Sequence, residues 1–236
     1  MGSEEGGQPA VAAGPSRREQ VIELLVFLFI ILPPLALSSL EISHASLPFA
    51  LAAGATILDD LALVALVLFF LWRNQEPVGR LGWTTRNLAG NVLIGLLLFV
   101  PLFLLSGILD AILTAAGLGA SPQTPSFLQF QGPAGAALAL LLVAVVAIAE
   151  ETIFRGYLIL RFSSATASPW AAVLLSSVVF SLGHGYEGIA GVIVTGLLGL
   201  VYAVIYVSRK SLVAPVVLHF LQDFTAIILL PLLGVR

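Results

Sequence analysis

The chain has 236 residues, of which 59% are hydrophobic and only 10% are charged. Soluble domains are about 45–50% apolar and about 25% charged, so this composition excludes a soluble globular protein and indicates a polytopic membrane protein. The net charge of −3 gives no sign of a nucleic-acid partner, and the absence of cysteine excludes disulfides and thiolate metal sites.

Residues 1–19 are rich in Gly, Ala, Pro and Glu, and we expect them to form a disordered tail. Seven apolar runs follow, and their lengths suit membrane-spanning helices. The runs cover residues 20–40, 47–72, 88–117, 133–161, 168–185, 188–208 and 211–234. The sequence therefore predicts an all-α integral membrane bundle of about seven spans, and an eighth, re-entrant or half-span stays open.

Basic residues predict the orientation of this bundle. Eight of the ten fall on one side of a seven-span arrangement: Arg17, Arg18, Arg73, Arg80, Arg86, Arg161, Arg209 and Lys210. Only Arg236 falls on the other side, and Arg155 lies within a span. The positive-inside rule then places the N-terminus and the 73–87 connection in the cytoplasm. Trp83 in this connection fits a segment lying in the membrane interface, and a plain solvated loop fits equally well.

Small residues recur every four positions along one face of the sixth span, at Gly191, Thr195, Gly199 and Ala203. Such a stripe lets a second helix approach closely. We interpret it as a packing face, with a substrate groove as the alternative.

Three charges interrupt the fourth apolar run, at Glu150, Glu151 and Arg155. A charge at bilayer depth costs about 2.5–3.5 kcal/mol on insertion scales, so such residues are usually paired or functional. Glu151 and Arg155 are four residues apart and are expected to form an ion pair on one helix face. Glu150 points about 100° away and lacks this partner. Glu150 is therefore the candidate general base.

Two further polar patterns lie in the later spans. His184 fits either an interfacial residue or a site residue. His219 and Asp223 are four apart on one face, which suits a hydrogen bond between helices, a pair aimed at a reacting carbonyl, or a metal-binding pair. At about 1.5 Å per residue, Glu150, His219 and Asp223 lie at similar depths, about 15, 12 and 18 Å from the inner ends of their spans. His184 lies at about 24 Å, so its place in the site stays open.

These patterns resemble the motifs of a known family. Their order along the chain is Glu150-Glu151-x-x-x-Arg155, then Phe180-x-x-x-His184, then His219-x-x-x-Asp223. They are similar to the motifs of the CPBP family, the CAAX prenyl protease and bacteriocin-processing (Abi) group of intramembrane proteases. The resemblance covers about 135–225. It implies a division into N-terminal membrane spans at 20–132 and a four-helix catalytic core at 133–236.

The resemblance implies a glutamate-dependent endopeptidase, of a kind formerly classed as metalloproteases. Glu150 and His184 would activate a water, while His219 and Asp223 would stabilise the oxyanion. Asp223 would orient His219 or be protonated itself, since the eukaryotic enzymes carry Asn at this position. Supporting roles would fall to Glu151, Arg155 and Phe180.

The same resemblance implies no required cofactor. Zinc remains a minority alternative, because two histidines and two carboxylates are a possible ligand set, here Glu150, His184, His219 and Asp223. The implied substrate is a membrane-associated peptide or prenylated protein, and the implied location is a bacterial inner membrane.

Two other functions remain open from the sequence. Intramembrane acids and histidines also build proton relays, but the seven runs show no obvious inverted repeat of the transporter kind. A catalytically silent scaffold or immunity protein is the other alternative.

Overall fold

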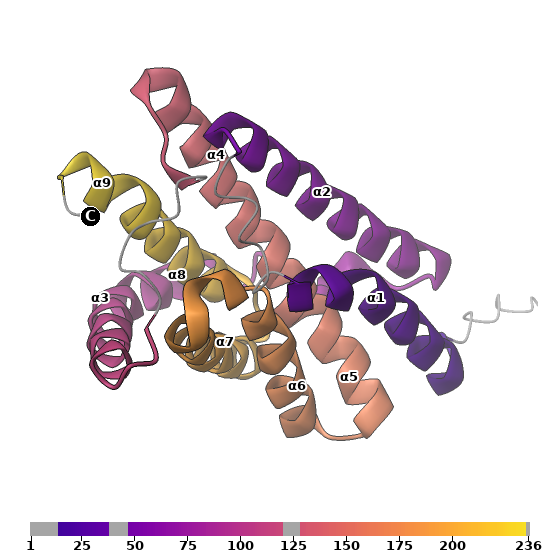
Figure 1. Ribbon diagram of the computed structural model, residues 1–236. Helices are drawn as coiled ribbons and strands as arrows, with labels where there is room; N and C mark the ends of the chain where they lie inside the picture. The colour runs from indigo at the N-terminus through magenta and orange to yellow at the C-terminus, as the bar shows by residue number, and fades with distance from the viewer. Residues whose placement is uncertain (1–13, 38–46, 120–127, 235–236) are drawn as a thin grey trace, which may run out of the picture.

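The computed structural model describes residues 14–37, 47–119 and 128–234. Within these ranges every regular element is helical, which confirms the all-α prediction. The main helices, shown in Figure 1, are α1 (Arg17–Leu37), α2 (Phe49–Arg73), α3 (Leu88–Ala115), α4 (Gly132–Glu150), α5 (Ile159–Thr166), α6 (Pro169–Leu182), α7 (Gly188–Arg209), α8 (Val213–Asp223) and α9 (Leu230–Leu232). The larger part of the predicted tail, residues 1–13, lies outside the described ranges, as do His44 and Arg236.

Seven apolar helical stretches occupy the predicted places, and in the described ranges six of them are long and apolar enough to cross a membrane. The chain is therefore a multi-pass membrane protein. The exception is α6, which has only 14 residues. It spans about 21 Å at 1.5 Å per residue, less than the roughly 30 Å of a bilayer core. The predicted fifth span is thus a short helix that ends at Leu182, before His184.

The fourth stretch is one continuous helix of 35 residues, from Gly132 to Thr166. Its middle, Glu151–Leu158, is π-helical, and all eight side chains there are buried. A π-helical stretch inside an α-helix widens the turn and is frequent at functional sites. The helix continues five residues beyond the predicted end at residue 161, so it reaches further than the apolar pattern indicates.

Close packing of α6 against α7 confirms part of the small-residue interpretation. A Cβ atom at Gly199 would lie 2.9 Å from the Phe180 ring, so only glycine lets the two helices approach this far. Ala203 on the same stripe is fully buried. Thr195 instead donates a hydrogen bond to Glu187, 3.3 Å away, and so serves a different contact.

Arg161 was expected at the end of the fourth span, but the helix continues to Thr166 and the Arg161 side chain is fully buried. Its Nη2 donates to Glu23 of α1 at 2.9 Å, and its Nη1 donates to Glu76 at 3.2 Å. Glu23 also accepts hydrogen bonds from Tyr157 at 3.0 Å and Asn74 at 2.6 Å. We call these five residues the Arg161 network. It ties α1 and the α2–α3 connection to the long helix.

The α2–α3 connection is packed on the bundle and is therefore not a free loop. Leu81 in its short helical turn, Val78–Leu81, is fully buried. Trp83 donates its indole N–H to Thr152 Oγ1 at 3.1 Å. Gly82 has φ of +91°, and a Cβ there would meet the Tyr206 ring at 2.6 Å, so glycine is required at this turn. The connection therefore supports the π-helical stretch from outside.

Replacing Glu23 by Gln is expected to destabilise the protein. Breaking a buried ion pair costs about 3–5 kcal/mol, and Glu76 remains beside Arg161, so we expect the low end of this range. Thermal unfolding in detergent micelles should show a Tm lower by several degrees. The matched control is Asp110→Asn on α3, where the carboxylate is exposed, and an equal Tm in both variants would contradict the role of the network.

Stability should also depend on the ionisation of Glu76, which lies in the connection outside the spans. Burial alone raises the pKa of this carboxyl, but hydrogen bonding to Arg161 and the charges of Arg161 and Arg80 outweigh it and hold the pKa below its ordinary value of 4.5. A depressed folded-state pKa stabilises the protein fully above the unfolded-state value, and this contribution disappears as pH falls through the folded-state pKa. Tm should therefore fall on acidification below about pH 4.5, and less steeply in Glu76→Gln.

Candidate active site

His219 on α8 is the centre of a cluster of carboxylates. Its Nδ1 lies 3.0 Å from Glu151 Oε1, and its Nε2 lies 3.3 Å from Asp223 Oδ2 and 3.7 Å from Glu150 Oε2. The His219 side chain is only 7% exposed. The end of α4, the start of the π-helical stretch and α8 therefore meet at one depth, where the apolar patterns place Glu150, His219 and Asp223.

The two adjacent glutamates lie on different sides of one imidazole. Glu151 faces Nδ1, whereas Glu150 faces Nε2. The predicted ion pair is confirmed, since Arg155 Nη1 donates to Glu151 Oε1 at 2.9 Å. Glu151 thus joins Arg155 and His219, which is more than the internal pair expected from spacing. Glu150 is free of Arg155, as predicted.

Phe180 connects the parts of the site through its ring. The guanidinium of Arg155 stacks over this ring at 4.0 Å, a cation–π contact that helps to bury the charge. The rings of His184 and His219 lie 5.0 Å and 6.0 Å from the same phenyl ring. Because α6 carries Phe180, this helix holds Arg155 in place against α7.

His184 lies beside the cluster and not in it. It follows the end of α6, and its Nδ1 is 3.3 Å from the backbone oxygen of Phe180. In the described ranges no hydrogen bond or ion pair joins it to Glu150, His219 or Asp223. Its segment still faces the site, because Tyr186, whose ring is 6.1 Å from the His184 ring, interacts electrostatically with Glu150 and Asp223.

Several buried polar atoms around His219 have no hydrogen-bond partner among the described residues. They are Glu150 Oε2, Glu151 Oε2, Arg155 Nη2 and the Tyr202 hydroxyl. Tyr202 belongs to the cluster because its ring lies 6.1 Å from His219 and 5.4 Å from the Arg155 guanidinium. Buried unpaired groups are rare in folded proteins and call for an explanation. Two unpaired acceptors and two unpaired donors are thus gathered around one imidazole.

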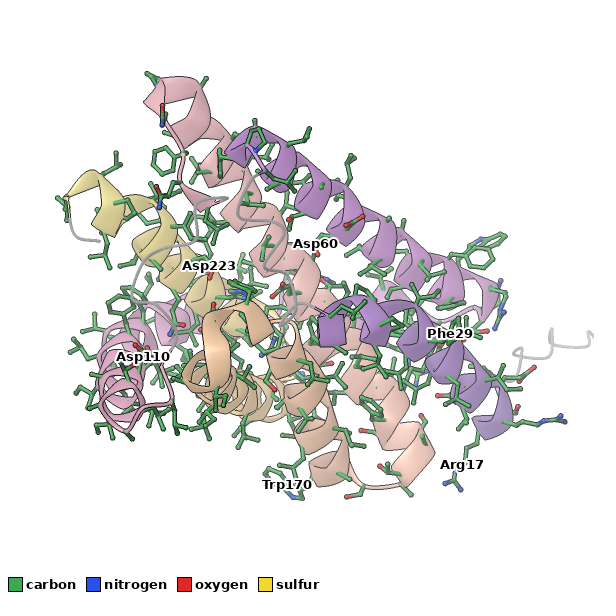
Figure 2. The ribbon with its side chains drawn as sticks, viewed as in Figure 1. Arg17, Phe29, Asp60, Asp110, Trp170 and Asp223 are labelled. Atoms are coloured by element: carbon green, nitrogen blue, oxygen red, sulfur yellow. The ribbon has the colours of Figure 1, made fainter. Side chains whose placement is uncertain are left out.

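Asp60 on α2 is a member of this neighbourhood that the sequence motifs do not include. It is 9% exposed, and its charge interacts with those of His219 and Glu150. Figure 2 labels Asp60 on α2 beside α4. The signal in the sequence is the pair Asp59-Asp60 inside an apolar run, but only the fold shows which of the two faces the site.

The zinc alternative stays a prediction. Within the described ranges, no three His, Asp or Glu residues are arranged to hold a metal ion. His184 is out of contact with the other three proposed ligands, and Nε2 of His219 faces Asp223. No step of the mechanism below uses a metal.

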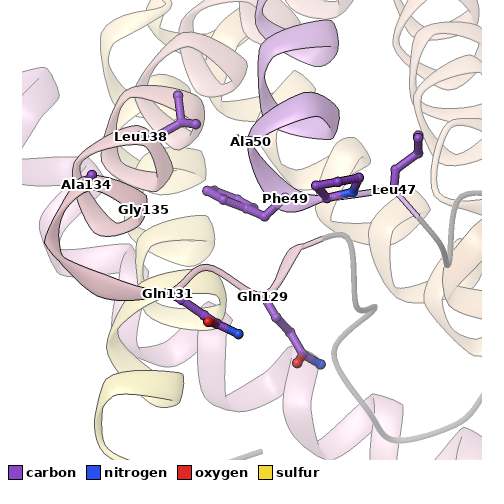
Figure 3. Close-up of a pocket in the computed structure, with 9 residues that line it drawn as sticks. Leu47, Phe49, Ala50, Gln129, Gln131, Ala134, Gly135 and Leu138 are labelled. Atoms are coloured by element: carbon purple, nitrogen blue, oxygen red, sulfur yellow. The ribbon is translucent and has the colours of Figure 1, made fainter.

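A pocket of about 530 Å³ lies at the beginnings of α2 and α4, remote from this cluster (Figure 3). Its lining includes Phe49, Gln131 and Leu138. Leu138 precedes Glu150 by twelve residues, which is about 18 Å along the helix. The pocket is therefore separate from the carboxylates around His219.

The late helices match a known family. Residues 132–225 match the family model described as type II CAAX prenyl endopeptidase Rce1-like. No curated protein and no solved structure matches the chain. The match covers α4 through α8 and every residue of the three motifs. The match spans 94 of the 236 residues, and over this region the chain is similar to the CAAX protease (CPBP) family of intramembrane proteases.

Proposed function

We propose that this protein is an intramembrane endopeptidase in which Glu150 acts as the general base. The observation that carries the proposal is the meeting of Glu150, His219 and Asp223 at one depth. Glu150 is the one carboxylate of the EExxxR motif without an arginine partner, and its Oε2 has no hydrogen-bond partner among the described residues. A general base needs such a free oxygen to hold a water.

In the proposed reaction, Glu150 takes a proton from a water whose oxygen attacks the carbon of the scissile carbonyl. The same proton then passes to the leaving amine as the carbon–nitrogen bond breaks. A hydrogen bond from Nε2–H of His219 stabilises the oxyanion, which is usually the largest single contribution in such reactions. Glu151 accepts the hydrogen bond from Nδ1–H and so fixes the orientation of the ring.

Asp223 has two possible roles in this scheme. As a carboxylate it orients the Nε2–H of His219, 3.3 Å away. As a protonated acid it donates a hydrogen bond to the oxyanion, which a carboxylic acid in an apolar site is able to do. In the first role Asp223 acts through His219, and in the second it acts on the oxyanion directly.

His184 is proposed as the second group acting on the water. Its Nδ1 faces the carbonyl oxygen of Phe180 at 3.3 Å, and a carbonyl only accepts, so Nδ1 carries the proton. Nε2 is then left as an acceptor. This leaves His184 able to accept a hydrogen bond from the water.

The substrate is proposed to be a membrane-associated peptide or prenylated protein, and the location a bacterial inner membrane with the N-terminus in the cytoplasm. Seven basic residues support the orientation after Arg161 is set aside. All are exposed at the ends of helices or in connections on one predicted side: Arg17, Arg18, Arg73, Arg80, Arg86, Arg209 and Lys210.

Glu150→Gln is expected to lower kcat by about 10²–10⁴-fold, the usual contribution of a general base, with an unchanged Tm. Cleavage should be followed in proteoliposomes with two fluorogenic peptides, one with a farnesylated C-terminus and one anchored by an apolar helix. Asp110→Asn serves as the control and should cleave like the unmodified protein. If Glu150→Gln still cleaves either peptide at the normal rate, Glu150 is not the general base.

Glu151→Gln should behave differently from Glu150→Gln, because it leaves Arg155 buried without its partner. Removing one member of a buried pair costs about 3–5 kcal/mol, so the Tm in micelles should fall clearly. Glu151→Gln should thus lower the Tm, whereas Glu150→Gln should lower kcat at an unchanged Tm. A Tm equal to that of Glu150→Gln would contradict the supporting role of Glu151.

A further inference from the structure

Asp60 is the group near the site that the proposed mechanism does not use. It lies on α2, outside the residues 132–225 that match the family. Its side chain is more than nine-tenths buried, and its Oδ2 has no hydrogen-bond partner among the described residues. A buried acid in an apolar helix without a stabilising hydrogen bond adds nothing obvious to the fold. The adjacent Asp59 is exposed on the same helix.

Asp60 interacts with charged groups of two other helices, Glu150 at the end of α4 and His219 on α8. The same site also holds Glu151 and Arg155 of the π-helical stretch and Asp223 of α8. The interactions of Asp60 are attractive with His219 and repulsive with Glu150 and Asp59. Since α2 packs along α4, this arrangement is part of the helix interface and does not depend on a loop.

We propose that Asp60 is a positioning residue of the active site, acting through Glu150 and His219. A negative charge beside a carboxylate favours uptake of a proton by that carboxylate, and a base that holds its proton more strongly removes it from water more effectively. The same charge favours the protonated form of His219, which stabilises the oxyanion. The inference rests on the proposed function, because it assumes that Glu150 is the base.

The test compares Asp60→Asn with Asp60→Glu and with the control Asp59→Asn, using the same peptides in proteoliposomes. Asp60→Asn should lower kcat by about three- to tenfold with KM unchanged, through the weaker base. The acidic limb of its pH–rate profile should move to lower pH, because Glu150 ionises more easily without the neighbouring charge. Asp60→Glu keeps the charge, so its kcat and the pH of its acidic limb should equal those of the unmodified protein. The control Asp59→Asn should also match the unmodified protein.

The possible outcomes separate this inference from the proposed function. Cleavage by Glu150→Gln defeats the proposed function. An inactive Glu150→Gln together with an Asp60→Asn that keeps both kcat and the acidic limb overturns only the role of Asp60. A lower Tm and lower kcat without movement of the limb also overturns it, because a structural residue would behave in this way. Should Asp60→Asn fail to fold, Asp60→Ser provides a smaller neutral side chain for the same measurement.

Discussion

The buried imidazole of His219 is the contact on which the active-site region depends. Its Nδ1 faces Glu151, and its Nε2 faces Glu150 and, on its own helix, Asp223, so the long helix that carries both glutamates must lie against α8. At bilayer depth the cost of separating such groups is high, because no water replaces the lost partners. The ring thus fixes the relative placement of the long helix and α8. Arg155 and Phe180 extend the same restraint to α6 and α7.

The π-helical stretch explains how one helix serves so many partners. Within eight residues it presents Glu151 and Arg155 to the site, Thr152 to Trp83, and Tyr157 to Glu23. A regular α-helix repeats every 3.6 residues and would confine such groups to fewer directions. The wider turn of a π-helix changes this spacing. The EExxxR motif is therefore a polar segment facing both the site and the neighbouring helices.

Much of the fold could be predicted from the sequence, because apolar runs of bilayer length and a few charges within them are strong signals. The ion pair of Glu151 with Arg155 followed from spacing alone. The Arg161 network could not be predicted, because Glu23 and Glu76 are 138 and 85 residues away along the chain. The place of Asp60 near the site could not be predicted either, because Asp60 is far along the chain from Glu150 and His219. The position of His184 beside the Phe180 ring could not be predicted, because it depends on how α6 packs against the other helices.

The unbroken helix from Gly132 to Thr166 sets a fixed distance between Glu150 in the candidate site and Arg161 in its buried network. Arg161 and Glu150 are eleven residues apart on it, which corresponds to about 16 Å. An extended peptide advances about 3.3 Å per residue, so about five residues of unfolded chain are needed to cover that distance. A folded domain brought to the level of Arg161 would therefore keep its own backbone out of reach of Glu150. Under the proposed function, a substrate would therefore need about five unfolded residues between its folded part and the cleaved bond.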